Sequence, residues 1–198
     1  MKNLVISSVI SIGLFTACSN GSNNGASAEK KDSDTAQHST TTQEQTSTKQ
    51  NDTKGTPVKE LVSQYLQLKN ALASDNGKDA ATAGNGIVDA IGKVDKTAFT
   101  AEQKKTYDDV ADDAKEMAEH IGKNADKIAH QREHFDMLST DMYDLVKTFG
   151  AGQQLYKDFC PMYNNKKGAI WLSETKDIKN PYMGSKMPTC GEVKEELK

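Results

Sequence analysis

The stretch that decides the fold is PVKELVSQYLQLKNALA, residues 57–73. Its apolar residues recur at spacings of three and four positions, which is the period of one face of a helix. Thr56 followed by Pro57 is typical of a helix cap and a first helical residue. The stretch therefore predicts an amphipathic helix that buries one stripe. That stripe consists of Val58, Leu61, Tyr65, Leu68 and Leu72.

The same period continues through three more stretches, up to about residue 150. In the second, Gly84 and Gly86 each weaken a helix by about 1 kcal/mol relative to alanine, which indicates close approach of a neighbouring helix. Thr100 and Gln103 form a capping box at the start of the third. The fourth carries Gln131 at one position of its apolar stripe. We therefore expect a mainly all-α fold, an antiparallel four-helix bundle.

Beyond the fourth helix the sequence changes character. Residues 155–160 and 169–172 are short apolar stretches separated by Asn- and Gly-rich turn signals. They predict a C-terminal cap of loops and short strands on the bundle. Residues 57–198 then form one domain.

Composition excludes several classes of function. The 198-residue chain has a formal net charge of −3 and an isoelectric point near 5.8, so it lacks the basic patch of a nucleic-acid-binding protein. It has no nucleophile elbow, phosphate-binding glycine loop or zinc-protease helix motif. A Cys–His nucleophile pair would require Cys160 and His134 to meet, and no residue that would orient the base is identifiable. We expect a protein that is not an enzyme.

The first 17 residues predict an export signal. Lys2 supplies the positive charge, and an apolar stretch of 12 residues from Leu4 to Phe15 follows, which is too short to span a bilayer. Small residues directly before Cys18 resemble the lipobox of bacterial lipoproteins, with Phe15 where leucine is usual. We expect Cys18 to carry a lipid and residues 18–56, which are polar, to form a disordered tether. Ser19 after the lipidated cysteine favours the periplasmic side of the outer membrane over the inner membrane.

Sulfur is concentrated near the C-terminus. Cys160 and Met162 lie two residues apart, and Met187 and Cys190 three apart. In an exported protein the two cysteines predict a structural disulfide. The neighbouring thioethers favour another interpretation, because thiolate and thioether ligands select soft ions, above all Cu(I). Both interpretations remain open at this point.

Histidine offers a further ligand. His130 and His134 lie four residues apart on one face of the fourth helix, and such a pair is more often solvated than metal-bound. If the C-terminal segment folds back along this helix, His134 joins the sulfur residues. The predicted metal site is therefore Cys160, Met162, Met187, Cys190 and His134. His120 is expected to be only a favourable charge near the end of the third helix.

The sequence also resembles a bacterial domain of unknown function found on or beside the periplasmic adaptor (membrane-fusion) subunits of heavy-metal efflux pumps of the copper/silver and cobalt/zinc/cadmium types. The resemblance covers about residues 57–193, with departures at Tyr163, Met183 and Pro188, where Ala, Phe and Leu are usual. The motifs that carry it include Gln131 to Phe135, Cys160 to Met162, Gly168 to Ser173, Asn180 to Tyr182, and Met187 with Cys190 and Gly191.

The resemblance implies metal handling beside an efflux pump. The leading hypothesis is thus a lipid-anchored protein that binds Cu(I) or a similar soft ion as buffer, chaperone or efflux accessory, with a pump adaptor subunit as its partner. The alternative is an interaction module in which a Cys160–Cys190 disulfide closes a docking surface around Trp171 and Tyr182.

Overall fold

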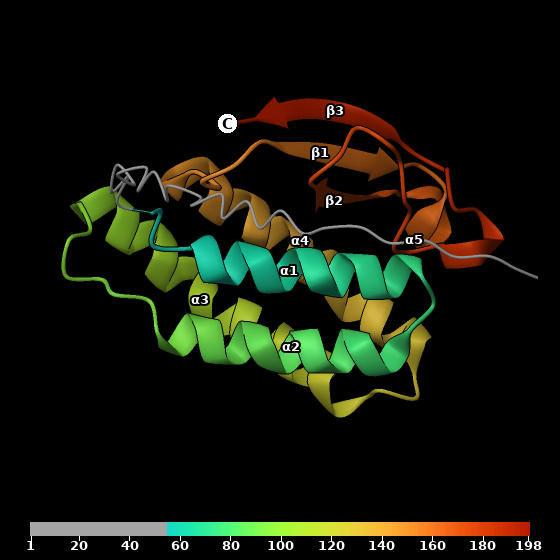
Figure 1. Ribbon diagram of the computed structural model, residues 1–198, viewed down its shortest axis with the longest axis horizontal. Coiled ribbons are helices and arrows are strands. Elements are labelled where there is room, and N and C mark those ends of the chain that lie inside the picture. Colours follow the sequence, from blue (N-terminus) through green and yellow to red (C-terminus); the bar gives the residue numbers. More distant parts are fainter. Residues whose placement is uncertain (1–54) are drawn as a thin grey trace, which may run out of the picture. The chain divides into compact units, whose positions relative to one another are not determined.

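Two regions make up the part of the chain that the computed structural model describes, residues 55–198: four helices and a small β-sheet (Figure 1). The helices are α1 (Lys59–Ala73), α2 (Gly77–Gly92), α3 (Ala101–Lys123) and α4 (Ile128–Phe149). The predicted signal peptide, lipidated Cys18 and nearly all of the tether lie outside the described residues. Within them, no helix is both long enough and apolar enough to cross a membrane.

The helical bundle forms where the apolar period predicts it. The stripe residues Leu61, Tyr65, Leu68 and Leu72 of α1 are at most 1% exposed. The capping box at the start of α3 is confirmed, with Thr100 and Gln103 each bonding the other's backbone. Gly84 of α2 lies so close to α3 that an added Cβ would be 2.9 Å from the Ala118 carbonyl oxygen. This confirms the predicted close helix approach.

The start of α1 differs from the prediction. The helix begins at Lys59, with Val58 as its N-cap residue. Thr56 instead donates its hydroxyl to the carbonyl oxygens of Phe149 and Gly150, each at 3.0 Å. Thr56 therefore ties the entry to α1 to the end of α4.

The C-terminal region is a three-stranded antiparallel sheet in the order β2-β1-β3. Its strands are β1 (Leu155–Cys160), β2 (Ala169–Ser173) and β3 (Glu192–Leu197); a four-residue helix, α5 (Tyr163–Lys166), links the first two, and a single 3-10 turn, η1 (Gly184–Lys186), precedes the third. The prediction of a mainly all-α fold is therefore wrong, and the fold is mixed. The strand missed was β3, whose charged sequence resembles a solvated tail, although it supplies hydrogen-bond partners for the outer edge of β1.

The sheet packs against the side of the bundle formed by α1 and α4 (Figure 1). Trp171 and Leu172 of β2 are fully buried there. The Tyr65 hydroxyl of α1 accepts a hydrogen bond from the Leu172 backbone N–H at 3.0 Å and bonds the Ser139 hydroxyl of α4 at 2.8 Å. One buried phenol thus joins α1, α4 and the sheet.

A buried arginine ties the C-terminal segment to the ends of the helices. Arg132 of α4 donates to the carbonyl oxygens of Pro181, at 2.7 Å, and Leu72, at 2.8 Å, and also to the Asp75 carboxylate at 2.6 Å. Asp75 in turn accepts from the Ser185 backbone N–H at 2.9 Å. These bonds fix the loop before β3 against the turn between α1 and α2.

Candidate metal centre

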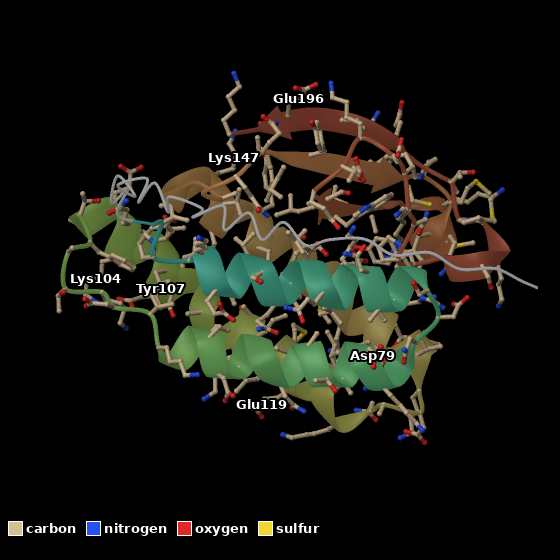
Figure 2. All side chains as sticks on the ribbon, in the orientation of Figure 1. Asp79, Lys104, Tyr107, Glu119, Lys147 and Glu196 are labelled. Carbon is tan, nitrogen blue, oxygen red and sulfur yellow. The ribbon has the colours of Figure 1, made fainter. Side chains whose placement is uncertain are left out.

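The two C-terminal cysteines meet at one end of the sheet. Cys160 is the last residue of β1, fully buried, and Cys190 lies just before β3, half-buried. Their sulfur atoms are 3.2 Å apart, and both cysteines are free thiols. Figure 2 shows yellow sulfur atoms of several side chains around this end of the sheet. The structure thus brings together the two cysteines that the sequence placed thirty residues apart.

Backbone contacts place Met162 and Met187 beside the two cysteines. The Met162 backbone N–H is close enough to the Cys190 thiol to lower its pKa, and the Cys190 backbone N–H donates to the Met187 carbonyl oxygen at 3.2 Å. The side chain of Met162 is 46% exposed and that of Met187 is 37% exposed. Four sulfur-containing residues therefore surround one end of the sheet, with two buried or half-buried thiols and two solvent-accessible thioether side chains.

The turn after Cys160 depends on left-handed backbone. Asn164, Asn165 and Lys166 all have positive φ angles, a conformation that asparagine tolerates better than most residues. These residues reverse the chain between β1 and β2, directly after Met162. Their role is to return β2 alongside β1 with Ala169 opposite Cys160.

Asn180 positions the segment that carries Cys190. This side chain is 1% exposed. Its amide nitrogen donates to the Cys190 carbonyl oxygen, and its amide oxygen accepts from the backbone N–H groups of Tyr182 and Met183 at 2.8 and 2.9 Å. Because a buried amide left without partners is costly, this arrangement fixes the Cys190 backbone relative to β1.

The surroundings of Cys190 favour its protonated thiol in the absence of metal. The hydrogen bond to Cys160 and burial both raise the pKa of the Cys190 thiol, against a smaller lowering by the Met162 N–H. A soft metal ion would displace the thiol protons on binding, because the thiolate is the ligand form. Binding at this pair would therefore strengthen as the pH rises.

His134, the fifth predicted ligand, lies elsewhere. Its Nδ1 is 3.2 Å from the Met117 sulfur of α3, and its Nε2 is 3.1 Å from Nε2 of His130. The ring stacks on His120 with centroids 4.4 Å apart. The structure therefore places His134 with the other two histidines at the α3–α4 interface and not with the cysteines, and the Cys160–His134 nucleophile pair does not form.

Sequence reasoning missed His120 and Met117 as neighbours of His134. His120 lies in the last turn of α3, whereas His130 lies in the first turn of α4. In an antiparallel helical hairpin, residues equally far from the connecting turn face one another. Counting outward from the turn at residues 124–127 could have revealed the pair.

The predicted docking residues also differ in the structure. Trp171 is fully buried and Tyr182 is 3% exposed. Tyr182 packs on Phe135 and Tyr163 and donates its hydroxyl to the Ile170 carbonyl oxygen. Both aromatic residues belong to the core, so the predicted docking surface around them is not available.

Comparison with known proteins supports part of the expected resemblance. Residues 61–154 match the model of a family described as a protein of unknown function (DUF3347). No curated protein and no solved structure matches the chain significantly. The matched residues cover α1 to α4 and stop directly before β1, so the predicted domain of unknown function is confirmed for the bundle.

Proposed function

We propose that this protein is a non-enzymatic, lipid-anchored protein of the bacterial cell envelope that binds Cu(I) or a similar soft ion. The observation that carries the proposal is the pair of free thiols, with Cys160 and Cys190 sulfurs 3.2 Å apart. Thiolates flanked by thioethers are ligands that select Cu(I). The proposed ligands are Cys160 and Cys190, with Met162 and Met187 as weaker additional donors.

The surroundings of the pair support capture of an ion from a partner or from solution. Among residues 55–198, the exposed large hydrophobic side chains are Met137, Met162 and Met187, all methionines. Two of them adjoin the thiols. An exposed thioether can hold a soft ion weakly while a buried thiolate holds it strongly, so transfer from the surface to the pair has a physical route.

The biological setting is a proposal that rests on resemblance alone. A domain like this one occurs on or beside the adaptor subunits of heavy-metal efflux pumps, and this likeness supports a role as buffer, chaperone or efflux accessory. The predicted lipid on Cys18 would hold the site near the membrane, most readily on the periplasmic side of the outer membrane. An adaptor subunit is the proposed partner.

The test is competition with a coloured Cu(I) chelator under reducing conditions. Every protein carries Cys18→Ser, so that no third thiol contributes. Loss of a metal's outer-shell partner typically weakens binding by about 10- to 100-fold, and we expect loss of a direct thiolate in Cys160→Ser or Cys190→Ser to exceed that. Met162→Leu and Met187→Leu should weaken binding less than either cysteine substitution, and His134→Gln should leave it unchanged.

A thiol count on protein from the periplasm separates this proposal from the disulfide alternative. Two reactive thiols, those of Cys160 and Cys190, are expected if the pair binds metal in the cell, because the proposed lipid on Cys18 leaves that cysteine without a free thiol. A Cys160→Ser/Cys190→Ser protein that binds Cu(I) as tightly as its parent would contradict the proposed Cu(I) site. Absence of free thiols in the cell would favour a structural disulfide.

A further inference from the structure

The three histidines at the turn between α3 and α4 form a second cluster of metal-binding groups. His120 comes from α3, and His130 and His134 come from α4. One nitrogen from each ring can be chosen so that all three lie within 4.8 Å of one another. The cysteine pair with Met162 and Met187 lies in the C-terminal segment, so the two clusters occupy different elements. Glu119, which precedes His120 and is labelled in Figure 2, lies on the side of the molecule away from the sheet.

The distance between two of the rings fits a tetrahedral ion. Nε2 of His130 and Nε2 of His134 are 3.1 Å apart. Two nitrogens bound to Zn²⁺ at about 2.0–2.1 Å with a tetrahedral angle lie about 3.3 Å from each other. The spacing of the two nitrogens is therefore close to the one that an ion requires, and binding would need the rings to turn so that both lone pairs point at a common position.

The opposite nitrogen of each of these two rings already has a partner. His134 Nδ1 lies 3.2 Å from the Met117 sulfur, and His130 Nδ1 lies 3.4 Å from a Glu133 carboxylate oxygen. Metal-binding histidines usually donate their second N–H to such an acceptor, which fixes the tautomer that leaves the other nitrogen free. Met117 and Glu133 thus hold the rings with both Nε2 atoms directed at each other.

We propose that His120, His130 and His134 bind a borderline divalent cation, with Zn²⁺ as the representative ion. Imidazole nitrogen suits Zn²⁺ and the neighbouring transition metals better than it suits hard ions. The His120 side chain is 46% exposed, and its Nε2 lies 3.9 Å from a Glu116 carboxylate oxygen, so turning toward the ion would exchange this solvent-accessible contact for a metal–nitrogen bond. The fourth coordination position would remain open to water, as in zinc sites with three protein ligands.

Two carboxylates lie beside the rings. Glu133 is 3.4 Å from His130 Nδ1, and Glu116 is 3.9 Å from His120 Nε2. These carboxylates supply negative charge near an incoming cation.

This site goes beyond the proposed function, because it uses other residues and another class of ion. The experiment is designed to keep the two apart. Zn²⁺ binding is measured by isothermal titration on a protein with all three cysteines replaced by serine, so that thiolates contribute nothing. We expect one equivalent of Zn²⁺ to bind, and Co²⁺ to bind in its place with the visible absorption of tetrahedral coordination.

Substitutions then identify the ligands. His130→Gln or His134→Gln should weaken Zn²⁺ binding by at least about 100-fold, whereas Met117→Leu should cost about tenfold, as for an outer-shell partner. His38→Gln, which replaces the remaining histidine of the sequence, is the matched control and should change nothing.

Two outcomes would overturn the proposal. The first is a cysteine-free protein that binds no Zn²⁺ at pH 7.5. The second is a triple His→Gln variant that binds Zn²⁺ as tightly as its parent. Circular dichroism of each variant confirms that the helices are retained, so loss of binding reports on the ligands and not on folding.

Discussion

The bundle and the C-terminal segment (residues 150–198) depend on polar contacts to different degrees. Helices α1 to α4 pack through a continuous apolar seam, exemplified by Leu68, Ile121 and Leu145, each fully buried. The C-terminal segment adds residues such as Trp171 to the same apolar core, but it is also fixed by particular polar contacts, among them Arg132 to Pro181 and Asn180 to Cys190. An apolar seam tolerates rearrangement, whereas a buried polar contact works only with the right partner. The difference explains why the first region has a periodic sequence and the second does not.

The largest effect should follow from a charge in the apolar seam. Leu145→Asp removes a buried leucine, worth about 2–5 kcal/mol, and buries a carboxylate that has no partner. The sum approaches the whole stability of an ordinary domain, about 5–15 kcal/mol. We expect both regions to unfold together, measured by circular dichroism and urea titration.

The control for this change is Thr140→Asp, which puts the same charge on an exposed position of the same helix. Surface substitutions usually change stability by less than about 0.5 kcal/mol. If Leu145→Asp leaves the protein folded with the urea midpoint of the wild type, the apolar seam is not required to keep the two regions folded.

A smaller and more local effect should follow from loss of the buried arginine. Arg132→Met leaves the Leu72 and Pro181 carbonyl oxygens without their donor, at about 1–3 kcal/mol for each unsatisfied group. We expect a loss of about 3 kcal/mol. Hydrogen exchange should show faster opening of β3 and the preceding loop, while α2 and α3 keep their protection.

Lys147→Met is the matched comparison, because Lys147 also lies on α4 and also reaches the C-terminal segment. Its ion pair with Glu195 is formed by side chains 49% and 32% exposed, and such pairs contribute about 0–1 kcal/mol. Equal effects of the two substitutions would contradict the importance assigned to the buried contact.

The contrast between the regions also explains what the sequence could predict. Apolar periodicity predicted all four helices, and the spacing of Thr100 and Gln103 predicted the capping box, because those features depend on local sequence. The β3 strand could not be predicted, since its residues Glu192 to Leu197 are mostly charged and their partner is the edge of β1, which lies far earlier in the sequence, with Phe159 opposite Glu192 and Leu155 opposite Leu197. Pairing of Cys160 with Cys190 could be anticipated, because these two cysteines remain once Cys18 is assigned to the lipid. The separation of His134 from the cysteine pair could not be anticipated, because it depends on which side of α4 the sheet covers.

The smallest expected effect concerns a buried carboxyl group between the two regions. Asp158 of β1 is fully buried opposite Trp171 of β2, and neither of its carboxylate oxygens has a hydrogen-bond partner among the described residues. Burial raises its pKa to about 7, with Lys69 lowering it and Glu174 raising it further. Lys69 of α1 is itself buried and paired with Glu174 at 2.7 Å. Ionised Asp158 would therefore lie beside a cation whose charge is already compensated.

The sign of the pH dependence follows from the raised pKa. A carboxyl group with a higher pKa in the folded state than in the unfolded chain contributes stability below about pH 4, and this contribution is lost as the pH rises through about 7. Wild-type protein should lose about 2 kcal/mol of unfolding free energy between pH 5 and pH 8 through this group. Asp158→Asn should remove that loss, and exposed Asp177→Asn should not. Parallel urea midpoints for the wild type and Asp158→Asn across this range would show that Asp158 ionises as freely in the folded protein as in the unfolded chain.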